Sequence, residues 1–283
     1  MPDLNTRRTA FRQLHESGCF VIPNPWDIGT ARYLQHLGFK AIATTSAGLA
    51  FSRGLPDAGW AVARDEALSH ISQIVGASAL PVNADFESGY AHEPEGVAVN
   101  VQLCVATGVA GLSIEDATGN KKHPLYELPL AVDRLKAARE AIDQSAPGVL
   151  LTGRCECYLV GHEQPFREAV LRLQAYAEAG ADVLYAPGLS EPNEIQELVA
   201  AVRPKPVNIL MSSNTGLRVV DLADVGVRRV SVGSSLARAA WTGFIHAARE
   251  IAEDGSFAGF DGSVPFAELN GFFQEDSKGP RSI

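Results

Sequence analysis

One short pattern recurs along this chain: an amphipathic stretch with helical spacing, then a glycine, a brief link and an apolar run. It is clearest at Gly38, Gly108, Gly180 and Gly226, which open "GFKAI", "GVAGLSI", "GADVLY" and "GVRRVSV". A glycine just past a helical stretch suits the left-handed cap that ends many helices. Repeated alternation of helix and strand predicts parallel strands joined by crossover helices.

The apolar runs number eight and show no clean polar alternation, as expected of strands buried on both faces. They are residues 19–24, 40–46, 81–85, 111–116, 149–154, 182–187, 206–210 and 228–233. Eight units without a linker predict an α/β fold, the closed (β/α)8 TIM barrel, as one domain over 1–283. A doubly wound open sheet is the alternative, but "PNPWDIGTA" after the first run is not its G-x-G-x-x-G fingerprint.

Residues 234–283 follow the eighth run and are predicted to form a C-terminal helix and an extension. In the extension, Phe266, Leu269, Phe272 and Phe273 recur at helical spacing although the barrel is already complete. A short apolar helix beyond a finished barrel packs on a neighbouring subunit or on its own barrel, and the sequence leaves both open.

Composition excludes several classes of function. A net charge of −9 argues against nucleic-acid binding. No apolar run reaches the ~18 residues of a membrane span, and the N-terminus has no apolar signal segment, so a cytoplasmic protein is expected. Four cysteines are too few for a disulfide scaffold, and "CEC" lacks the Cys-x-x-Cys spacing of structural zinc sites.

Acidic residues stand where two neighbouring runs end. Asp85 and Glu87 close "PVNADFE", and Glu115 closes "GLSIE". In a barrel, the reactive residues lie at the C-terminal ends of strands, so these carboxylates should meet at one mouth. Three acids in a small space repel unless a cation lies between them, and oxygen ligands select Mg²⁺ or Mn²⁺. Solvated loop acids or helix caps are the simpler alternative.

Other polar residues should reach the same mouth. Arg154 could hold a substrate carboxylate, or form a salt bridge to Glu115 or Glu156. The "TTSAG" segment could cradle an oxyanion, or be a plain strand-to-helix turn. The candidate substrate-binding residues are Thr44, Ser46, Ala47, Gly48, Arg154 and Asn208. His123 lies on a loop near the mouth and could titrate usefully, although a loop histidine is more often solvated.

Together these segments resemble the isocitrate lyase/phosphoenolpyruvate mutase superfamily. The resemblance runs from about residue 20 to 240 and is strongest in "LPVNADFESGYA", "GVAGLSIEDATG" and "LLTGRCECYLVG". It implies a barrel whose eighth helix is exchanged between subunits of a homodimer or homotetramer. It also implies Mg²⁺ near Asp85, supported by Glu87 and Glu115, with a small carboxylate substrate held by residues 46–48 and Arg154. Asp57, in "GLPDAG", matches an acid near the metal and the reacting carbon.

The chain departs from that family in places. The lyases carry a Lys-[Lys/Arg]-Cys-Gly-His loop, whereas "TGNKKHPLYELPL" contains no cysteine; Asn120 could fill the place of the loop Asn in the phosphonate enzymes. Glu87 replaces the usual Asp, and "YAPG" lacks the phosphonate enzymes' His. The resemblance therefore indicates a divergent, Cys-less branch.

The expected function is a Mg²⁺-dependent lyase that forms or cleaves a bond next to an α-keto acid through an enolate, as an oxaloacetate decarboxylase does. The candidate catalytic residues are Asp57, Tyr90, Glu115, His123 and Arg154. A phosphoenolpyruvate mutase or phosphonopyruvate hydrolase is one alternative, and a non-catalytic binder of keto acids is another.

Overall fold

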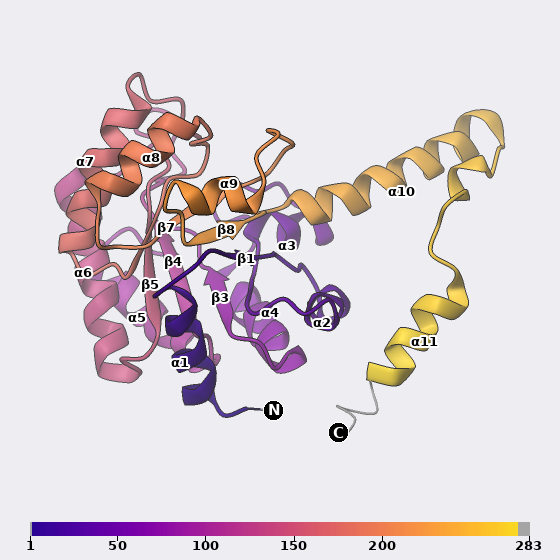
Figure 1. The fold of residues 1–283 in the computed structure, drawn as a ribbon, viewed down its shortest axis with the longest axis horizontal. Helices are drawn as coiled ribbons and strands as arrows, with labels where there is room; N and C mark the ends of the chain where they lie inside the picture. The colour runs from indigo at the N-terminus through magenta and orange to yellow at the C-terminus, as the bar shows by residue number, and fades with distance from the viewer. Residues whose placement is uncertain (1, 277–283) are drawn as a thin grey trace. The chain divides into compact units, whose positions relative to one another are not determined.

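The eight apolar runs form the eight parallel strands of one sheet in the computed structural model, which describes residues 2–276 (Figure 1). The strands are β1 (Phe20–Ile22), β2 (Ile42–Ala43), β3 (Val82–Asp85), β4 (Gly111–Glu115), β5 (Leu150–Arg154), β6 (Val183–Tyr185), β7 (Val207–Leu210) and β8 (Arg229–Ser231). The ladder runs β1-β8-β7-β6-β5-β4-β3-β2. Its two ends meet where Ala43 N–H donates to the Pro23 carbonyl at 3.0 Å. The predicted (β/α)8 barrel is confirmed.

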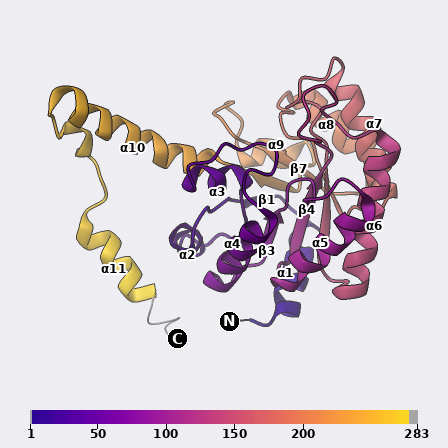
Figure 2. The ribbon, with the colours of Figure 1, turned by 180° about the vertical axis from the view of Figure 1, so that it is seen from behind.

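Helices between the strands surround the sheet, as the front and back views show (Figures 1 and 2). They are α2 (Ile28–His36), α3 (Ser46–Ser52), α4 (Arg64–Ala77), α5 (Pro94–Ala106), α6 (Leu128–Ser145), α7 (Pro165–Glu178), α8 (Pro192–Ala201) and α9 (Val219–Asp224). Gly38, Gly108, Gly180 and Gly226 have φ of 84°, 93°, 100° and 92°. These left-handed values are the caps that the recurring glycine predicts.

Helix α1 (Leu4–Leu14) packs against the barrel floor, a role that the sequence did not indicate. Its Phe11 is fully buried and clusters with Ile22, Leu150 and Val183. Asp3 caps the helix, its Oδ1 accepting from the N–H groups of Asn5 and Thr6. Only Arg7 and Phe11 of this helix are buried, so its apolar stripe is too sparse to reveal the contact.

A buried polar contact joins α1 to the barrel interior. His15 Nδ1 lies 2.8 Å from the Phe11 carbonyl, which assigns it the proton, and Nε2 accepts from Arg229 Nη1 at 3.5 Å. Arg229 also donates to Asn208 Oδ1 at 2.9 Å and Thr152 Oγ1 at 3.1 Å. Burial, reinforced by the Arg229 charge, lowers the pKa of His15 to about 3. His15 is therefore neutral in the folded protein.

The low pKa of His15 makes stability depend on pH. Below pH ~6.5 the His15 side chain binds a proton in the unfolded chain but not in the folded one. The contribution of His15 to the free energy of unfolding is therefore fully present above pH ~6.5 and is lost as the pH falls toward 3. When the pH is lowered from 7.5 to 5, we expect His15 to lower the free energy of unfolding by about 2 kcal/mol, as measured by urea unfolding. His15→Gln should remove that part of the loss. His36→Gln, at an exposed helical histidine, should keep it, and equal losses in wild type and His15→Gln would contradict the assignment.

Among the described residues, 236–276 form a second compact unit, distinct from residues 2–235. It holds most of α10 (Ser235–Asp254), a 3₁₀ turn (Ala258–Phe260) and α11 (Phe266–Asp276), so both predicted C-terminal helices are present. Residues 277–283 of the predicted extension lie outside the described residues. Exchange of this region between subunits stays a prediction.

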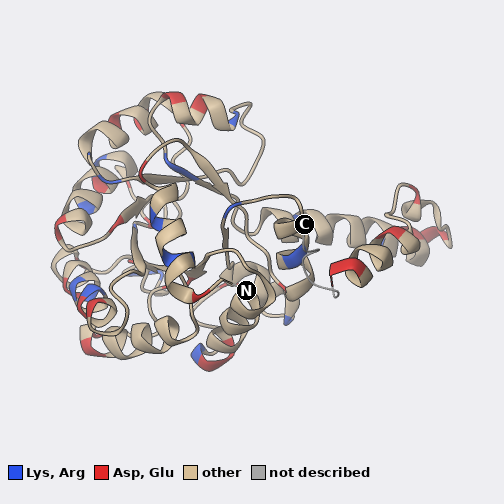
Figure 3. Ribbon diagram, turned by 60° about the horizontal axis from the view of Figure 1, so that its bottom comes forward, with Lys and Arg blue, Asp and Glu red and all other residues tan. Residues whose placement is uncertain are grey.

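Charged residues of both signs are interspersed along the outer helices of the barrel (Figure 3). Among residues 2–276, no helix is long and apolar enough to cross a membrane.

Candidate active site

The acids at the strand ends converge on Arg154, at the C-terminal end of β5. Arg154 Nη1 lies 3.2 Å from both Asp85 Oδ1 and Glu115 Oε2, and its Nε lies 2.5 Å from Glu156 Oε1. The cause is the register: Glu115 pairs directly with Arg154 across the β4–β5 ladder. Of the alternatives left by the sequence, the salt bridge is therefore present, and it includes Asp85 as well.

One cation in this cluster faces three acids, and burial makes the excess negative charge costly. Burial raises the pKa of Glu115 well above its usual range, although Arg154 opposes the shift. Burial alone would lower the pKa of Arg154, but Glu115, Glu156 and Asp85 outweigh it and raise that pKa. Arg154 Nη2 makes no hydrogen bond within residues 2–276. It can bind an incoming carboxylate while Nη1 and Nε hold the protein acids.

The "TTSAG" segment anchors Asp85. Ser46 donates to Asp85 Oδ2 from its backbone N–H and from its hydroxyl, each at 2.9 Å. The Asp85 N–H donates to Thr44 Oγ1 at 2.9 Å, and the Gly48 N–H donates to the capping Thr45 Oγ1 at 3.2 Å. Of the predicted oxyanion cradle, the donors of Ser46 and Gly48 are thus engaged within the protein. The Ala47 N–H has no partner among residues 2–276 and can donate to a ligand.

Three non-glycine residues with positive φ occur around this mouth: Trp60 (57°), Glu87 (47°) and Tyr90 (53°). Such backbone is strained and clusters at functional sites. The Tyr90 hydroxyl donates to Glu87 Oε1 at 2.8 Å, and Trp60 Nε1 donates to Ser88 Oγ at 3.1 Å. The bond from Trp60 ties the loop after β2 to the loop after β3, and the bond from Tyr90 lies within the loop after β3.

Two further carboxyl groups of the mouth have raised pKa values. Burial raises the pKa of Glu87 to about 7, although its bond from Tyr90 opposes the shift, and the charges of Asp85 and Asp57 add to it. Asp57 lies at the rim with an exposed surface, yet the protein around its carboxylate and the charge of Asp85 raise its pKa too. Within the described part of the chain, the acids of the mouth thus outnumber its one cation, Arg154.

The donor set fits a hard divalent cation, although no ready-made cage exists. Within residues 2–276, no three acidic, histidine or cysteine side chains are grouped as metal ligands, because Arg154 lies between Asp85 and Glu115. Mg²⁺ keeps several waters and needs only one or two protein carboxylates. Asp85 could therefore hold Mg²⁺ or Mn²⁺ directly, with Glu87 and Glu115 acting through water. A bound cation would also relieve the charge excess that raises the pKa of Glu87.

Two predicted site residues are not brought into this cluster. His123 is exposed; its backbone N–H donates to the Asn120 carbonyl, and its carbonyl accepts from the Thr118 hydroxyl of the same loop. Asn208 is buried inside the barrel, where its Oδ1 accepts from Arg229 and its Nδ2 donates to Ser231 Oγ at 2.9 Å. Asn208 does line a cavity of about 50 Å³ that also borders Asp85 and Arg154.

The structure gives Glu156, named from the sequence only as a salt-bridge alternative for Arg154, a place in the site, and it adds Tyr185. Glu156 pairs with Arg154 and is held by Asp116, whose Oδ1 accepts from the Glu156 N–H at 2.8 Å. Tyr185 lies beneath the Arg154 guanidinium, 5.4 Å from it to the ring centroid. The sequence already offered Glu156 as a partner of Arg154, whereas nothing in the sequence singled out Tyr185.

Comparison with known proteins agrees with this geometry. The family model described as phosphoenolpyruvate phosphomutase matches residues 11–252. The chain belongs to this family. The resemblance to the isocitrate lyase/phosphoenolpyruvate mutase superfamily is thus confirmed.

Relatives within the family are described as lyases, decarboxylases or mutases. A crystal structure from Burkholderia cenocepacia J2315, described as a candidate lyase/mutase, is 46% identical, covers 95% of this chain and 96% of that one, and superposes with a TM-score of 0.90. The oxaloacetate decarboxylase of Pseudomonas entomophila L48 is 30% identical over 80% of this chain and 78% of its own length. The 2-methylisocitrate lyase of Escherichia coli K12 is 31% identical over 66% and 64%.

Proposed function

We propose that this protein is a Mg²⁺-dependent lyase for a small α-keto or 2-hydroxy dicarboxylate, with decarboxylation of an oxaloacetate-like acid as its most concrete form. The observation that carries the proposal is Arg154, held by Asp85, Glu115 and Glu156 with Nη2 unused. The similarity to an oxaloacetate decarboxylase over 80% of the chain supports it.

In this proposal, the protein binds the substrate by its oxygens. Arg154 Nη2 binds one carboxylate, and the Ala47 N–H stabilises the developing enolate oxygen, an interaction worth ~3–4 kcal/mol for a well-placed donor. Mg²⁺ held at Asp85 would supply positive charge to the keto-acid oxygens. The C–C bond to the second carboxylate breaks, CO₂ leaves, and the electron pair forms the enolate. A proton then adds to the enolate carbon from which CO₂ left. Residues 117–130 would close over the bound substrate as a lid that excludes water.

The proton donor must be a group other than the lyase cysteine, which this loop lacks. The Tyr90 hydroxyl is engaged by Glu87. Asp57 lies at the rim, and burial and the charge of Asp85 raise its pKa, which is the direction that a general acid requires. We therefore propose Asp57 for this role.

Turnover of oxaloacetate should test the proposal, because the decarboxylase should need the metal and Asp85. With Mg²⁺ present and the uncatalysed rate subtracted, wild type should release CO₂, and EDTA should abolish the release. Asp85→Asn should lower kcat/KM more than 100-fold, whereas Asp133→Asn, an exposed acid on α6, should not. If no keto or 2-hydroxy acid is turned over, yet oxalate binds with Mg²⁺, the protein is a binder and the proposal is wrong.

A second candidate is an enzyme of P–C bonds, favoured by the phosphoenolpyruvate phosphomutase description of the matching family model. Phosphate release from phosphonopyruvate, or its formation from phosphoenolpyruvate, would identify this activity. The loop Asn120 is the residue on which it should then depend.

We also propose that the protein assembles as a homodimer or homotetramer with helix α10 exchanged between subunits. The supporting observation is an apolar, exposed set on that helix: Trp241, Phe244 and Ile245 are 41%, 61% and 38% exposed. Exposed aromatic residues grouped on one helix mark an interaction surface.

A further inference from the structure

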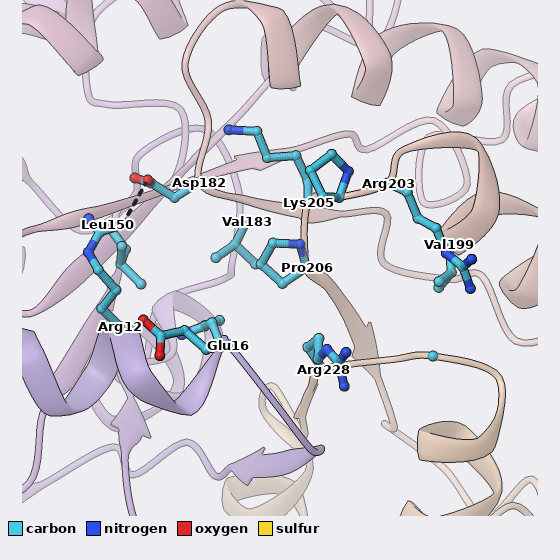
Figure 4. Close-up of a pocket in the computed structure, with 13 residues that line it drawn as sticks. Arg12, Glu16, Leu150, Asp182, Val183, Val199, Arg203, Lys205, Pro206 and Arg228 are labelled. Atoms are coloured by element: carbon cyan, nitrogen blue, oxygen red, sulfur yellow. Dashed lines mark ion pairs between the residues drawn. The ribbon is translucent and has the colours of Figure 1, made fainter.

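A pocket of about 590 Å³ lies at the amino-terminal ends of β5 to β8, beside α1 (Figure 4). Its apolar lining includes Leu150, Val183 and Pro206. Its volume falls within the ~300–1,000 Å³ of ligand sites. The acids and Arg154 lie at the other ends of the strands, so this pocket is separate from the candidate active site.

Basic residues outnumber acidic ones around this pocket. Arg12, Arg203, Lys205 and Arg228 line it, against Glu16 and Asp182. The chain as a whole carries −9, so the local excess of positive charge runs against its composition. An acidic protein that binds an anion needs a local cluster of this kind.

The Asp182 carboxylate is already neutralised. Its Oδ2 accepts from Arg139 Nη1 and from the Leu151 N–H, both at 2.9 Å, and Arg12 Nη1 lies 3.5 Å from its Oδ1. Asp182 therefore contributes little repulsion to an incoming anion.

Three cations of the pocket form no ion pair within residues 2–276. Arg203 and Lys205 precede β7, and Arg228 precedes β8, so adjacent strands present them together. Lys205 Nζ donates to the Ala181 carbonyl at 2.7 Å, and Arg228 Nη1 donates to the Gly18 carbonyl at 3.0 Å. These neutral acceptors fix both side chains without cancelling their charge, and each keeps further N–H groups for a ligand.

The cations lie at two ends of the pocket. In Figure 4, Arg203 and Arg228 lie to the right of Val183 and Pro206, and the Lys205 side chain lies above these two residues. Arg12 lies to the left, near Glu16 and Asp182. We propose that this pocket binds a small organic dianion. One of its carboxylate or phosphate groups would meet Arg203 and Arg228 at one cationic end, and the other would meet the Lys205 ammonium group at the second. Its apolar middle would then lie over Val183 and Pro206. The position, remote from the mouth, suits an effector, and the proposal is independent of the proposed reaction.

Binding to the full chain tests this inference. The probes are inorganic phosphate and the linear dicarboxylates of four to six carbons, measured by calorimetry and by thermal shift at constant ionic strength. The background is Arg154→Gln, which removes carboxylate binding at the mouth; circular dichroism first checks that this destabilised variant is folded at the temperature of the calorimetry. At least one dicarboxylate should bind with one-to-one stoichiometry and more tightly than phosphate, because only it reaches both cationic ends.

Adding Arg203→Gln and Arg228→Gln to that background should weaken this binding at least tenfold. Both arginines lie on loops and are at least partly accessible, so the variant should fold, which circular dichroism checks. Lys136→Gln with Arg167→Gln removes the same charge from exposed helix positions and should leave the affinity unchanged. The inference fails if no dicarboxylate binds, or if both double variants bind equally well. A melting temperature that rises with protein concentration but not with added probe would assign the pocket to a contact between copies of the chain. That outcome would also overturn the inference.

Discussion

Replacing Arg154 by Gln is expected to lower kcat/KM about a thousandfold or more and to destabilise the protein. The side chain is the one cation among Asp85, Glu115 and Glu156, and it is only 16% exposed. Removing one partner from a buried ion cluster typically costs ~3–5 kcal/mol, because the remaining charges are left unpaired. The substrate carboxylate would lose its Nη2 donor as well. Steady-state kinetics and urea unfolding measure the two losses separately.

Two further measurements separate binding from folding in this variant. Mg²⁺ should restore part of the lost stability of Arg154→Gln, since it would supply positive charge beside Asp85, but it should not restore turnover. Arg154→Lys should keep more stability than Arg154→Gln yet stay strongly impaired, because an ammonium group cannot replace the guanidinium fork. Arg167→Gln, at an exposed position on α7, is the control. Near wild-type turnover in Arg154→Gln would remove this residue from the mechanism.

Replacing Trp241 and Phe244 together by Glu is expected to convert the assembled protein to a monomer. The two side chains are 41% and 61% exposed in the single chain and lie one turn apart on α10, with their rings 5.3 Å apart. Burying aromatic residues of this size dominates the energy of most interfaces, and two charges there would remain desolvated. Light scattering coupled to gel filtration reports the mass.

The matched control makes the same chemical change on the barrel. Val99 on α5 and Leu171 on α7 are 56% and 51% exposed, and their replacement by Glu should leave the assembly intact. A wild-type protein that runs as a monomer at micromolar concentration would contradict the proposed exchange of α10. Circular dichroism should show that both double variants keep their helices.

The barrel strands were predictable because each buries both faces and so carries a local apolar signal. All eight observed strands fall within the predicted runs, and the glycines that end four helices have the expected left-handed φ. Helix α1 lacked such a signal. Its one buried aromatic, Phe11, gains its role only by reaching the floor formed by β1, β5 and β6.

The site was predictable as a set of strand ends but not as a set of contacts. Asp85, Glu115 and Arg154 meet because parallel strands bring their C-terminal ends to one mouth. Which donor each acid uses depends on side-chain packing, and the sequence could not show that Ser46 is engaged by Asp85. Asn208 was placed with the substrate-binding residues, whereas its amide contacts Arg229 and Ser231 inside the barrel.

The sequence by itself determined the barrel, its strand order and the residues delivered to its mouth, because these follow from local periodicity and from the direction of parallel strands. The tertiary structure alone decided the partners of Arg154, the neutral state of His15 and the cationic pocket beside α1. Each of these depends on charges that are distant in sequence and close in space, where burial strengthens their interaction.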